Sequence, residues 1–110
     1  MLTISPELAT AFETGTLQRW KTEITADLRR LHPDATAGFS RAALDDWVRS
    51  AMDSLRRLGG TSRQDIAFFV VTLFAVTEAD KDPRAMGDLA AIMGAATPYP
   101  AKMALLRQAF

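Results

Sequence analysis

The run from Ser62 to Glu78, S-R-Q-D-I-A-F-F-V-V-T-L-F-A-V-T-E, is the most apolar part of the chain and most constrains its fold. Its valines and phenylalanines would suit a buried strand, but the run is long for a strand and no second such run exists to pair with it. Ser62 and Asp65 have the S-x-x-D spacing of a helix N-terminal cap. From Ile66 the largest side chains recur at helical i, i+3, i+4 and i+7 spacing. We predict a central helix that the rest of the chain surrounds, and its polar residues make it a poor membrane span.

Length and charge restrict the class of protein. The chain has 110 residues, which predicts one domain, 1–110. Residues 1–60 hold eight basic and eight acidic side chains, and residues 61–110 hold five of each, so the net charge is zero in both parts. A protein that binds nucleic acid through its phosphates needs a basic excess, so we expect no nucleic-acid partner.

The absence of cysteine excludes disulfides, thiol catalysis and cysteine–zinc sites, and fits a reducing compartment. The first residues, M-L-T-I-S-P-E, have neither the basic nor the apolar region of a secretory signal. The expected location is the cytoplasm, with no membrane contact.

Capping residues divide the remainder into four more helices. Ser5-Pro6-Glu7 starts a helix over 6–31, which Gly15 could interrupt and Pro33 ends. Its apolar positions are Leu8, Phe12, Trp20, Ile24, Leu28 and Leu31. Residues 32–38 are predicted to form a loop.

The next helix, over 41–58, starts after Ser40 and ends at two glycines. Its inward stripe is Leu44, Val48, Ala51, Leu55 and Leu58. Asp82-Pro83 starts a helix over 83–94 with an inward side of Met86, Leu89, Ala90, Ile92 and Met93. Thr97-Pro98 starts a final short helix bearing Met103, Leu106 and Phe110. The predicted fold is all-α, a compact single-domain bundle of about five helices around the central apolar helix.

No residue pattern indicates catalysis, a cofactor or a metal site. His32 is the only histidine; it lies at a helix end with no serine or cysteine context, so a dipole partner is a better interpretation than a general base. The acidic turn at Glu78, Asp80 and Asp82 suggests calcium, but it lacks the glycine and the final glutamate of an EF-hand loop. A solvated turn with Asp82 as N-cap fits better.

Two features of the sequence that could suggest nucleic-acid binding are better explained in other ways. The arginines of the first two long helices alternate with aspartates, which favours a salt-bridged surface. A helix-turn-helix over residues 44–75 would use Ile66 to Val76 in its recognition helix, and that run is too apolar for a major groove.

Three aromatic residues are candidate anchors for a protein partner. Trp47 is at the edge of its helix's stripe, Tyr99 lies between two prolines in a predicted loop, and Phe110 ends the last helix. Aromatic side chains often anchor interfaces, although packing at the rim of the core is the ordinary explanation.

The chain resembles small helical accessory proteins encoded in bacterial type VI secretion loci, near spike proteins, effectors and their adaptor chaperones. Four stretches carry the resemblance: I-S-P-E-L-A-T-A-F-E (4–13), L-R-R-L-H-P (28–33), L-G-G-T-S-R-Q-D-I (58–66) and D-K-D-P (80–83). Taken in order, the four stretches cover nearly the whole chain. This chain departs from the family in having fewer aromatic residues before Pro33. The resemblance implies a cytoplasmic protein that helps an effector or its adaptor before secretion, and it brings no catalytic residue.

The expected function is therefore a protein–protein interaction module, an effector adaptor or co-chaperone that buries apolar surface against its partner. An immunity protein that neutralises an effector toxin is the alternative, and a small helical DNA-binding regulator is a further one. A homodimer is also compatible with the sequence.

Overall fold

The apolar run forms the helix at the centre of the molecule. A computed structural model of the chain describes the backbone of residues 6–110 and the side chains of residues 15–110. In it α4 (Arg63–Phe74) begins at Ser62, whose Oγ accepts a hydrogen bond of 3.1 Å from the backbone N–H of Asp65. The π-helix η1 (Ala75–Ala79) continues α4 directly. The side chains buried along this segment are Ile66, Phe69, Val70, Thr72, Phe74 and Val76. The prediction of a central helix is confirmed, with a π-helical last turn that it did not include.

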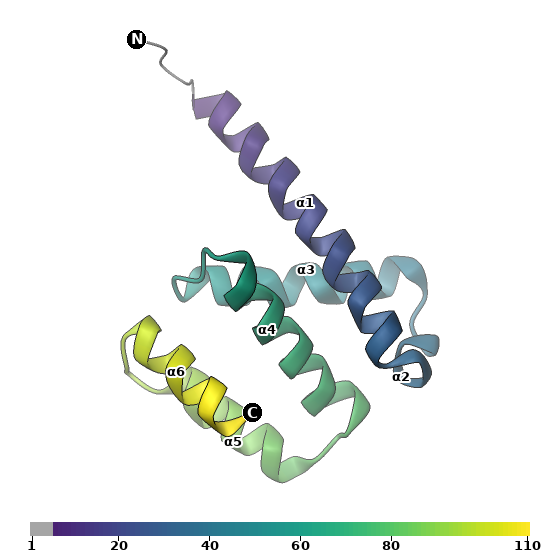
Figure 1. Cartoon of the computed structure of the whole chain (residues 1–110), viewed down its shortest axis with the longest axis vertical. Helices are drawn as coiled ribbons and strands as arrows, with labels where there is room; N and C mark the ends of the chain where they lie inside the picture. The colour runs from purple at the N-terminus through teal and green to yellow at the C-terminus, as the bar shows by residue number, and fades with distance from the viewer. Residues whose placement is uncertain (1–5) are drawn as a thin grey trace.

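Helix α1 (Pro6–Leu31) packs against α3 (Arg41–Arg57) and α4 (Figure 1). It runs unbroken through Gly15, and the predicted cap at Ser5 and the inward positions Leu8 and Phe12 lie outside the described residues and side chains. An ion pair ties α1 to α4, because Arg63 donates to Glu23 from Nε at 2.9 Å and from Nη2 at 2.6 Å.

Burial follows the predicted stripes in the middle of the helices and departs from them at the ends. Ile24 and Leu28 of α1 are fully buried, as is most of the predicted stripe of α3. Leu31 and Leu58 were predicted to point inward, yet they are 47% and 41% exposed because each lies where its helix ends.

The predicted loop 32–38 is wrong, because most of it forms the short helix α2 (Pro33–Ala37). Pro33 supplies a preset φ at the first helical position. The Thr36 hydroxyl, which is buried, donates to the carbonyl of His32 at 2.8 Å and closes the turn. One turn of helix is too short to show hydrophobic periodicity, so capping residues alone do not distinguish it from a loop.

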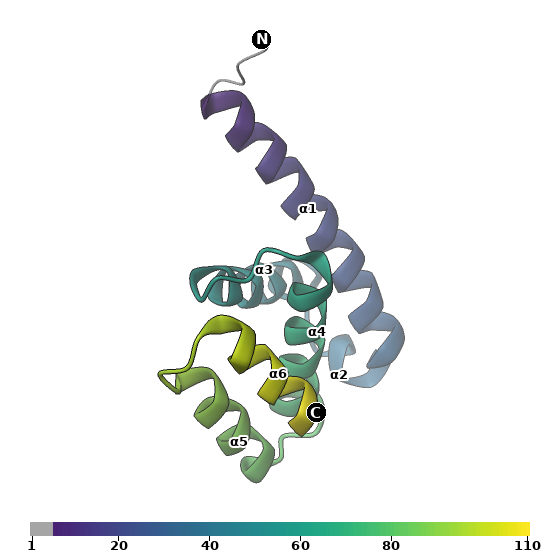
Figure 2. The same cartoon turned by 60° about the vertical axis from the view of Figure 1, so that its left-hand side comes forward.

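Helices α5 (Pro83–Gly94) and α6 (Tyr99–Ala109) form a hairpin beside α4 (Figure 2). Asp82 begins α5 by accepting a hydrogen bond of 3.0 Å from the backbone N–H of Arg84, as predicted for an N-cap. Leu89 of α5 and Met103 and Leu106 of α6 complete the core. Ala90, predicted to point inward, is exposed.

All regular structure in residues 6–110 is helical, so the all-α bundle is confirmed, with six α-helices instead of about five. The Cα radius of gyration is 15.3 Å, against about 13 Å for a compact domain of this length. The first half of α1 extends away from the other helices in both views and accounts for the elongation (Figures 1 and 2).

Candidate functional site

The hairpin of α5 and α6 carries the most unusual surface of the molecule, and a buried lysine holds the hairpin together. Lys102 is 5% exposed, and its Nζ donates to the carbonyls of Ile92 at 3.4 Å, Met93 at 2.8 Å and Ala95 at 2.6 Å. The last carbonyls of a helix have no partner within the helix, and they carry the negative end of its dipole. The ammonium of α6 therefore caps the C-terminus of α5.

Asp65, in the first turn of α4, fastens α6 to the central helix. Its Oδ2 accepts a hydrogen bond of 2.8 Å from the Tyr99 hydroxyl, and its Oδ1 accepts one of 2.7 Å from Arg107 Nη2. The Arg107 guanidinium also lies 4.6 Å from the centroid of the Phe68 ring, within cation–π range. These four side chains, Asp65, Phe68, Tyr99 and Arg107, are called the α4–α6 latch below.

The pKa values of the ionisable groups in the latch fit a structural role better than acid–base catalysis. The hydrogen bond from Arg107 is the main cause that lowers the pKa of Asp65, with Tyr99 and Ser62 adding to it against partial burial. Burial, and then the hydrogen bond to Asp65, raise the pKa of Tyr99 to about 12. A general acid or base needs a pKa near the working pH. At neutral pH both groups instead keep a fixed charge state.

From Leu89 onward, and outside the latch, the hairpin shows almost no charge on its surface. The 18 residues from Leu89 to Leu106 contain one ionisable cation, Lys102, and it is buried. Soluble globular domains ordinarily contain about 25% charged residues. The exposed members of this stretch, called the uncharged surface below, are Ala90, Ala91, Gly94, Ala96, Thr97, Pro98, Pro100, Ala101, Ala104 and Leu105.

Leu105 is the largest apolar side chain on the uncharged surface, at 42% exposed. It shares the outward side of α6 with Ala101 and Ala104, at the i, i+3 and i+4 spacing that gives one helix face. Phe110, directly after α6, is also 42% exposed. The hairpin thus presents small side chains, one large aliphatic one, and an aromatic ring at its end.

The structure does not bring the three predicted anchors together. Tyr99 and Phe110 belong to the α6 region, whereas Trp47 of α3 is half-buried and packs edge-on against Phe74, with ring centroids 5.1 Å apart at 87°. Phe74 is nine residues after Asp65, which in an α-helix is a turn of about 900° and therefore the opposite side. Trp47 and Tyr99 accordingly contact opposite sides of α4.

Two details of Tyr99 differ from the prediction. It is the first residue of α6 and not part of a loop, because Pro98 takes the N-cap position and Pro100 has the preset φ of the first turn. Its hydroxyl is already bonded to Asp65. Of the three candidate anchors, Phe110 has the most exposed side chain.

The residues that the sequence offered as candidates for catalysis or metal binding make structural contacts. The His32 ring packs against Phe74 with centroids 5.7 Å apart. Asp82 is the N-cap of α5, and Asp80 caps η1. Among the described side chains, no three His, Cys, Asp or Glu residues come close enough to hold a metal ion.

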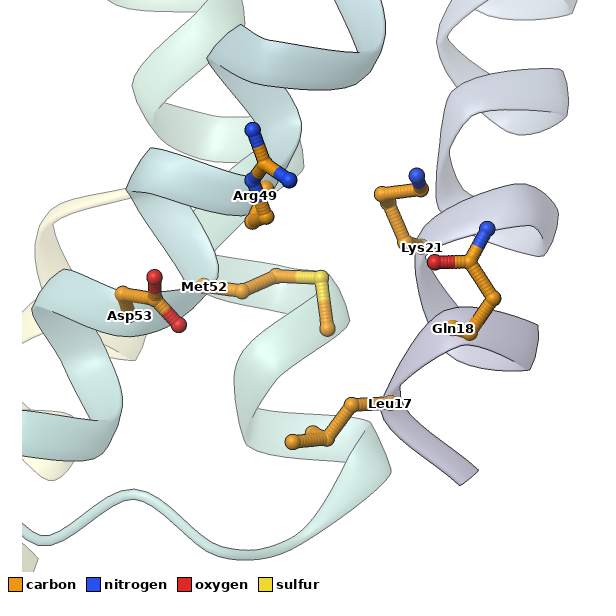
Figure 3. A pocket seen from close by; sticks show the side chains of 6 residues that line it. All are labelled: Leu17, Gln18, Lys21, Arg49, Met52 and Asp53. Atoms are coloured by element: carbon orange, nitrogen blue, oxygen red, sulfur yellow. The ribbon is translucent and has the colours of Figure 1, made fainter. Parts of the chain in front are cut away.

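A hollow of about 220 Å³ lies between α1 and α3 (Figure 3). Leu17 and Met52 point into it, and polar side chains surround it: Gln18, Lys21, Arg49 and Asp53. Pockets for small molecules are usually about 300–1,000 Å³ and enclose most of their ligand. This hollow is smaller, and one of its two cations, Arg49, is paired with Asp46, so it does not form a convincing ligand site.

Three arginines of α1 and α3 pair with aspartates on the same helix, in line with the alternating charges of the sequence. Arg49 Nη2 lies 2.7 Å from Asp46 Oδ1, and looser pairs join Arg30 to Asp27 at 3.5 Å and Arg56 to Asp53 at 3.7 Å. Such exposed pairs contribute little to stability, but they leave the helices without a purely basic face.

Sequence reasoning missed the latch, Lys102 and the uncharged surface. The latch joins residues 34 and 42 positions apart, and no local pattern indicates that pairing. Lys102 and the uncharged surface could have been found from the sequence. Leu89 to Leu106 is the longest stretch of residues 61–110 with so little charge.

Comparison with known proteins finds no family model, no curated protein and no solved structure that matches this chain. Within residues 6–110, no helix combines the length and the apolar character needed to cross a membrane.

Proposed function

We propose that this chain is a protein–protein interaction module that docks through the uncharged surface of the α5–α6 hairpin. One observation carries the proposal: an 18-residue stretch exposes small and apolar side chains and buries its only charge. Extended apolar surface on a soluble domain marks an interaction site. Burying it yields about 25 cal/mol for each Å² of apolar area removed from water.

The chemistry of this surface fits an apolar helix face on the partner. Alanine and glycine let a second backbone approach closely, at helix axis separations of about 8–10 Å. Leu105 supplies one large side chain to insert between residues of the partner. A nucleic acid would need exposed cations, and an anionic lipid surface would need them as well, so a protein partner fits best.

The resemblance to type VI accessory proteins supplies the class of partner. We propose an effector or its adaptor chaperone, met in the cytoplasm before secretion. The DNA-binding alternative loses support, because α4, which would be the recognition helix, buries its apolar side chains in the core.

The test is co-purification with the proteins encoded beside this chain in its own genome. The wild-type chain should retain an effector or adaptor, and Ala101→Glu and Leu105→Glu should each lose it, because a carboxylate would be desolvated in the interface. Ala42→Glu is the matched control: Ala42 is also an exposed alanine in the first turn of a helix, α3, and its variant should bind normally.

Equal binding by all four proteins would reject the uncharged surface as the docking site. Failure of every neighbouring gene product to bind would reject the interaction module. Protection of cells from a co-expressed neighbouring toxin, lost in the same two variants, would assign the immunity role in place of the adaptor role.

A further inference from the structure

The α5–α6 hairpin is a self-contained unit within the bundle. The bonds from Lys102 to the carbonyls of Ile92, Met93 and Ala95 lie entirely within it. The two helices also contact each other more extensively than either contacts α4 or η1. The hairpin would therefore keep its own structure if it moved as a whole.

The hairpin is attached to the central helix on one side. Leu89, Met103 and Leu106 join the core, and the polar contacts with α4 are those of the latch, from Tyr99 and Arg107 to Asp65. Each latch bond joins a residue of the hairpin to a residue before it, so the same bond can form within one chain or between two.

The link between η1 and α5 is short and strained. It consists of Asp80, Lys81 and Asp82, all exposed, and Lys81 has φ of 51°. Lys81 is the one non-glycine residue in the described chain with positive φ. A side chain with a Cβ is disfavoured in this left-handed conformation. Straightening the link would relieve that strain.

We infer that this chain forms a dimer by exchanging its α5–α6 hairpin with a second copy. In the dimer each hairpin lies on α4 of the other copy and re-forms the latch there. Every contact within the hairpin and across the latch is retained, while the strain at Lys81 is lost in both copies. Short strained links favour such exchange over intramolecular closure. Because association costs entropy, the dimer forms as the protein concentration rises.

A pair of charge reversals at the latch tests the exchange directly. Asp65→Arg places two arginines at the latch, and Arg107→Asp places two aspartates there, so each variant alone repels its own hairpin. Co-refolded from denaturant, the two variants can form an exchanged heterodimer with one native and one reversed ion pair. We expect the heterodimer to be the main species in native mass spectra. Its dimer-to-monomer ratio should exceed that of either variant refolded alone by about tenfold for each restored ion pair.

The control is the double variant Asp65→Arg/Arg107→Asp in one chain. It has the reversed pair in every copy, so its melting temperature should exceed that of either single variant and its monomer should persist at low concentration. If the co-refolded mixture contains only monomers with the melting behaviour of the separate variants, the exchange is wrong.

The link supplies a second test that does not depend on the latch variants folding. Lys81→Gly accepts positive φ without strain, so its dimer fraction after refolding should fall below that of the wild-type chain. Deletion of Lys81 leaves too short a link to turn back and should raise the dimer fraction. Equal dimer fractions in all three chains would also overturn the inference. Neither test involves the uncharged surface, so its outcome is independent of partner docking.

Discussion

Asp65 shows how one side chain can connect distant parts of the chain. Its backbone N–H donates to the N-cap Ser62, and its carboxylate accepts from Tyr99 and Arg107. The carboxylate also lies in the first turn of α4, where the helix dipole favours negative charge. The hydrogen bond from Arg107 is the largest cause of the lowered pKa of Asp65.

The lowered pKa predicts how stability depends on pH. A carboxyl whose pKa is lower in the folded state stabilises the fold above its unfolded pKa, about 4, and loses this as pH falls through the folded pKa. We expect Asp65→Asn to reduce the free energy of unfolding by about 1 kcal/mol at pH 7. The effect is modest because Asp65 and Arg107 are both partly exposed to solvent. Urea unfolding at pH 7 and at pH 3 should show the difference shrinking in acid. An equal difference at both pH values would contradict the assignment.

Gly60 is a second residue with a defined requirement, because a Cβ there would lie 2.7 Å from Cγ of Leu55. Leu55 is fully buried and has little room to move. We expect Gly60→Ala to cost about 1–3 kcal/mol in free energy of unfolding, as overpacking does. Gly87→Ala is the control: it lies inside α5 with open space around it and should stabilise by about 1 kcal/mol. Chemical denaturation measures both; equal effects would show that Leu55 relaxes.

At the scale of helices, capping residues and periodicity predicted most boundaries. The helices over 6–31 and 83–94 have the predicted ends, and α3 ends one residue early. These succeed because proline, serine and aspartate act on the nearest turn. The one-turn helix α2 and the π-helix η1 were not predicted, since neither has a distinctive local pattern.

The candidate site was far less predictable than the helices. Only Phe110, of the three proposed anchors, has an extensively exposed ring, and the sequence could not show that the Tyr99 hydroxyl would bind Asp65 or that the Trp47 ring would pack on Phe74. These are contacts between helices distant in the chain. Which side of an amphipathic helix is covered, and by what, depends on tertiary packing that periodicity does not specify.

Lys102 gives the prediction for the hairpin. Lys102→Met keeps the aliphatic stem but leaves the last carbonyls of α5 without their ammonium donor, which should cost about 1–3 kcal/mol. Hydrogen exchange should show faster exchange of amides in α5 and α6 than in α3. Lys81→Met removes the same charge from an exposed side chain and should leave exchange unchanged. Protected α5 amides in Lys102→Met would indicate that the carbonyls are solvated or capped otherwise.

At the scale of the whole molecule, α4 couples two sides that otherwise share few contacts. On one side the Phe74 ring contacts the rings of His32, Phe39 and Trp47. On the other, Asp65 and Phe68 hold α6. Because both groups of contacts depend on the same helix, we expect the helices to unfold together.

Phe69→Asp tests this dependence. Phe69 is 5% exposed in the middle of α4, and a carboxylate buried there without a partner costs far more than typical substitutions. We expect the variant to lose its helical circular dichroism and to show a red shift of tryptophan fluorescence. Both signals should reach their unfolded values together. Gln64→Asp, on the exposed first turn of the same helix, should leave both signals native. If Phe69→Asp stays folded and loses only its partner, α4 is itself the interface, and the core lies elsewhere.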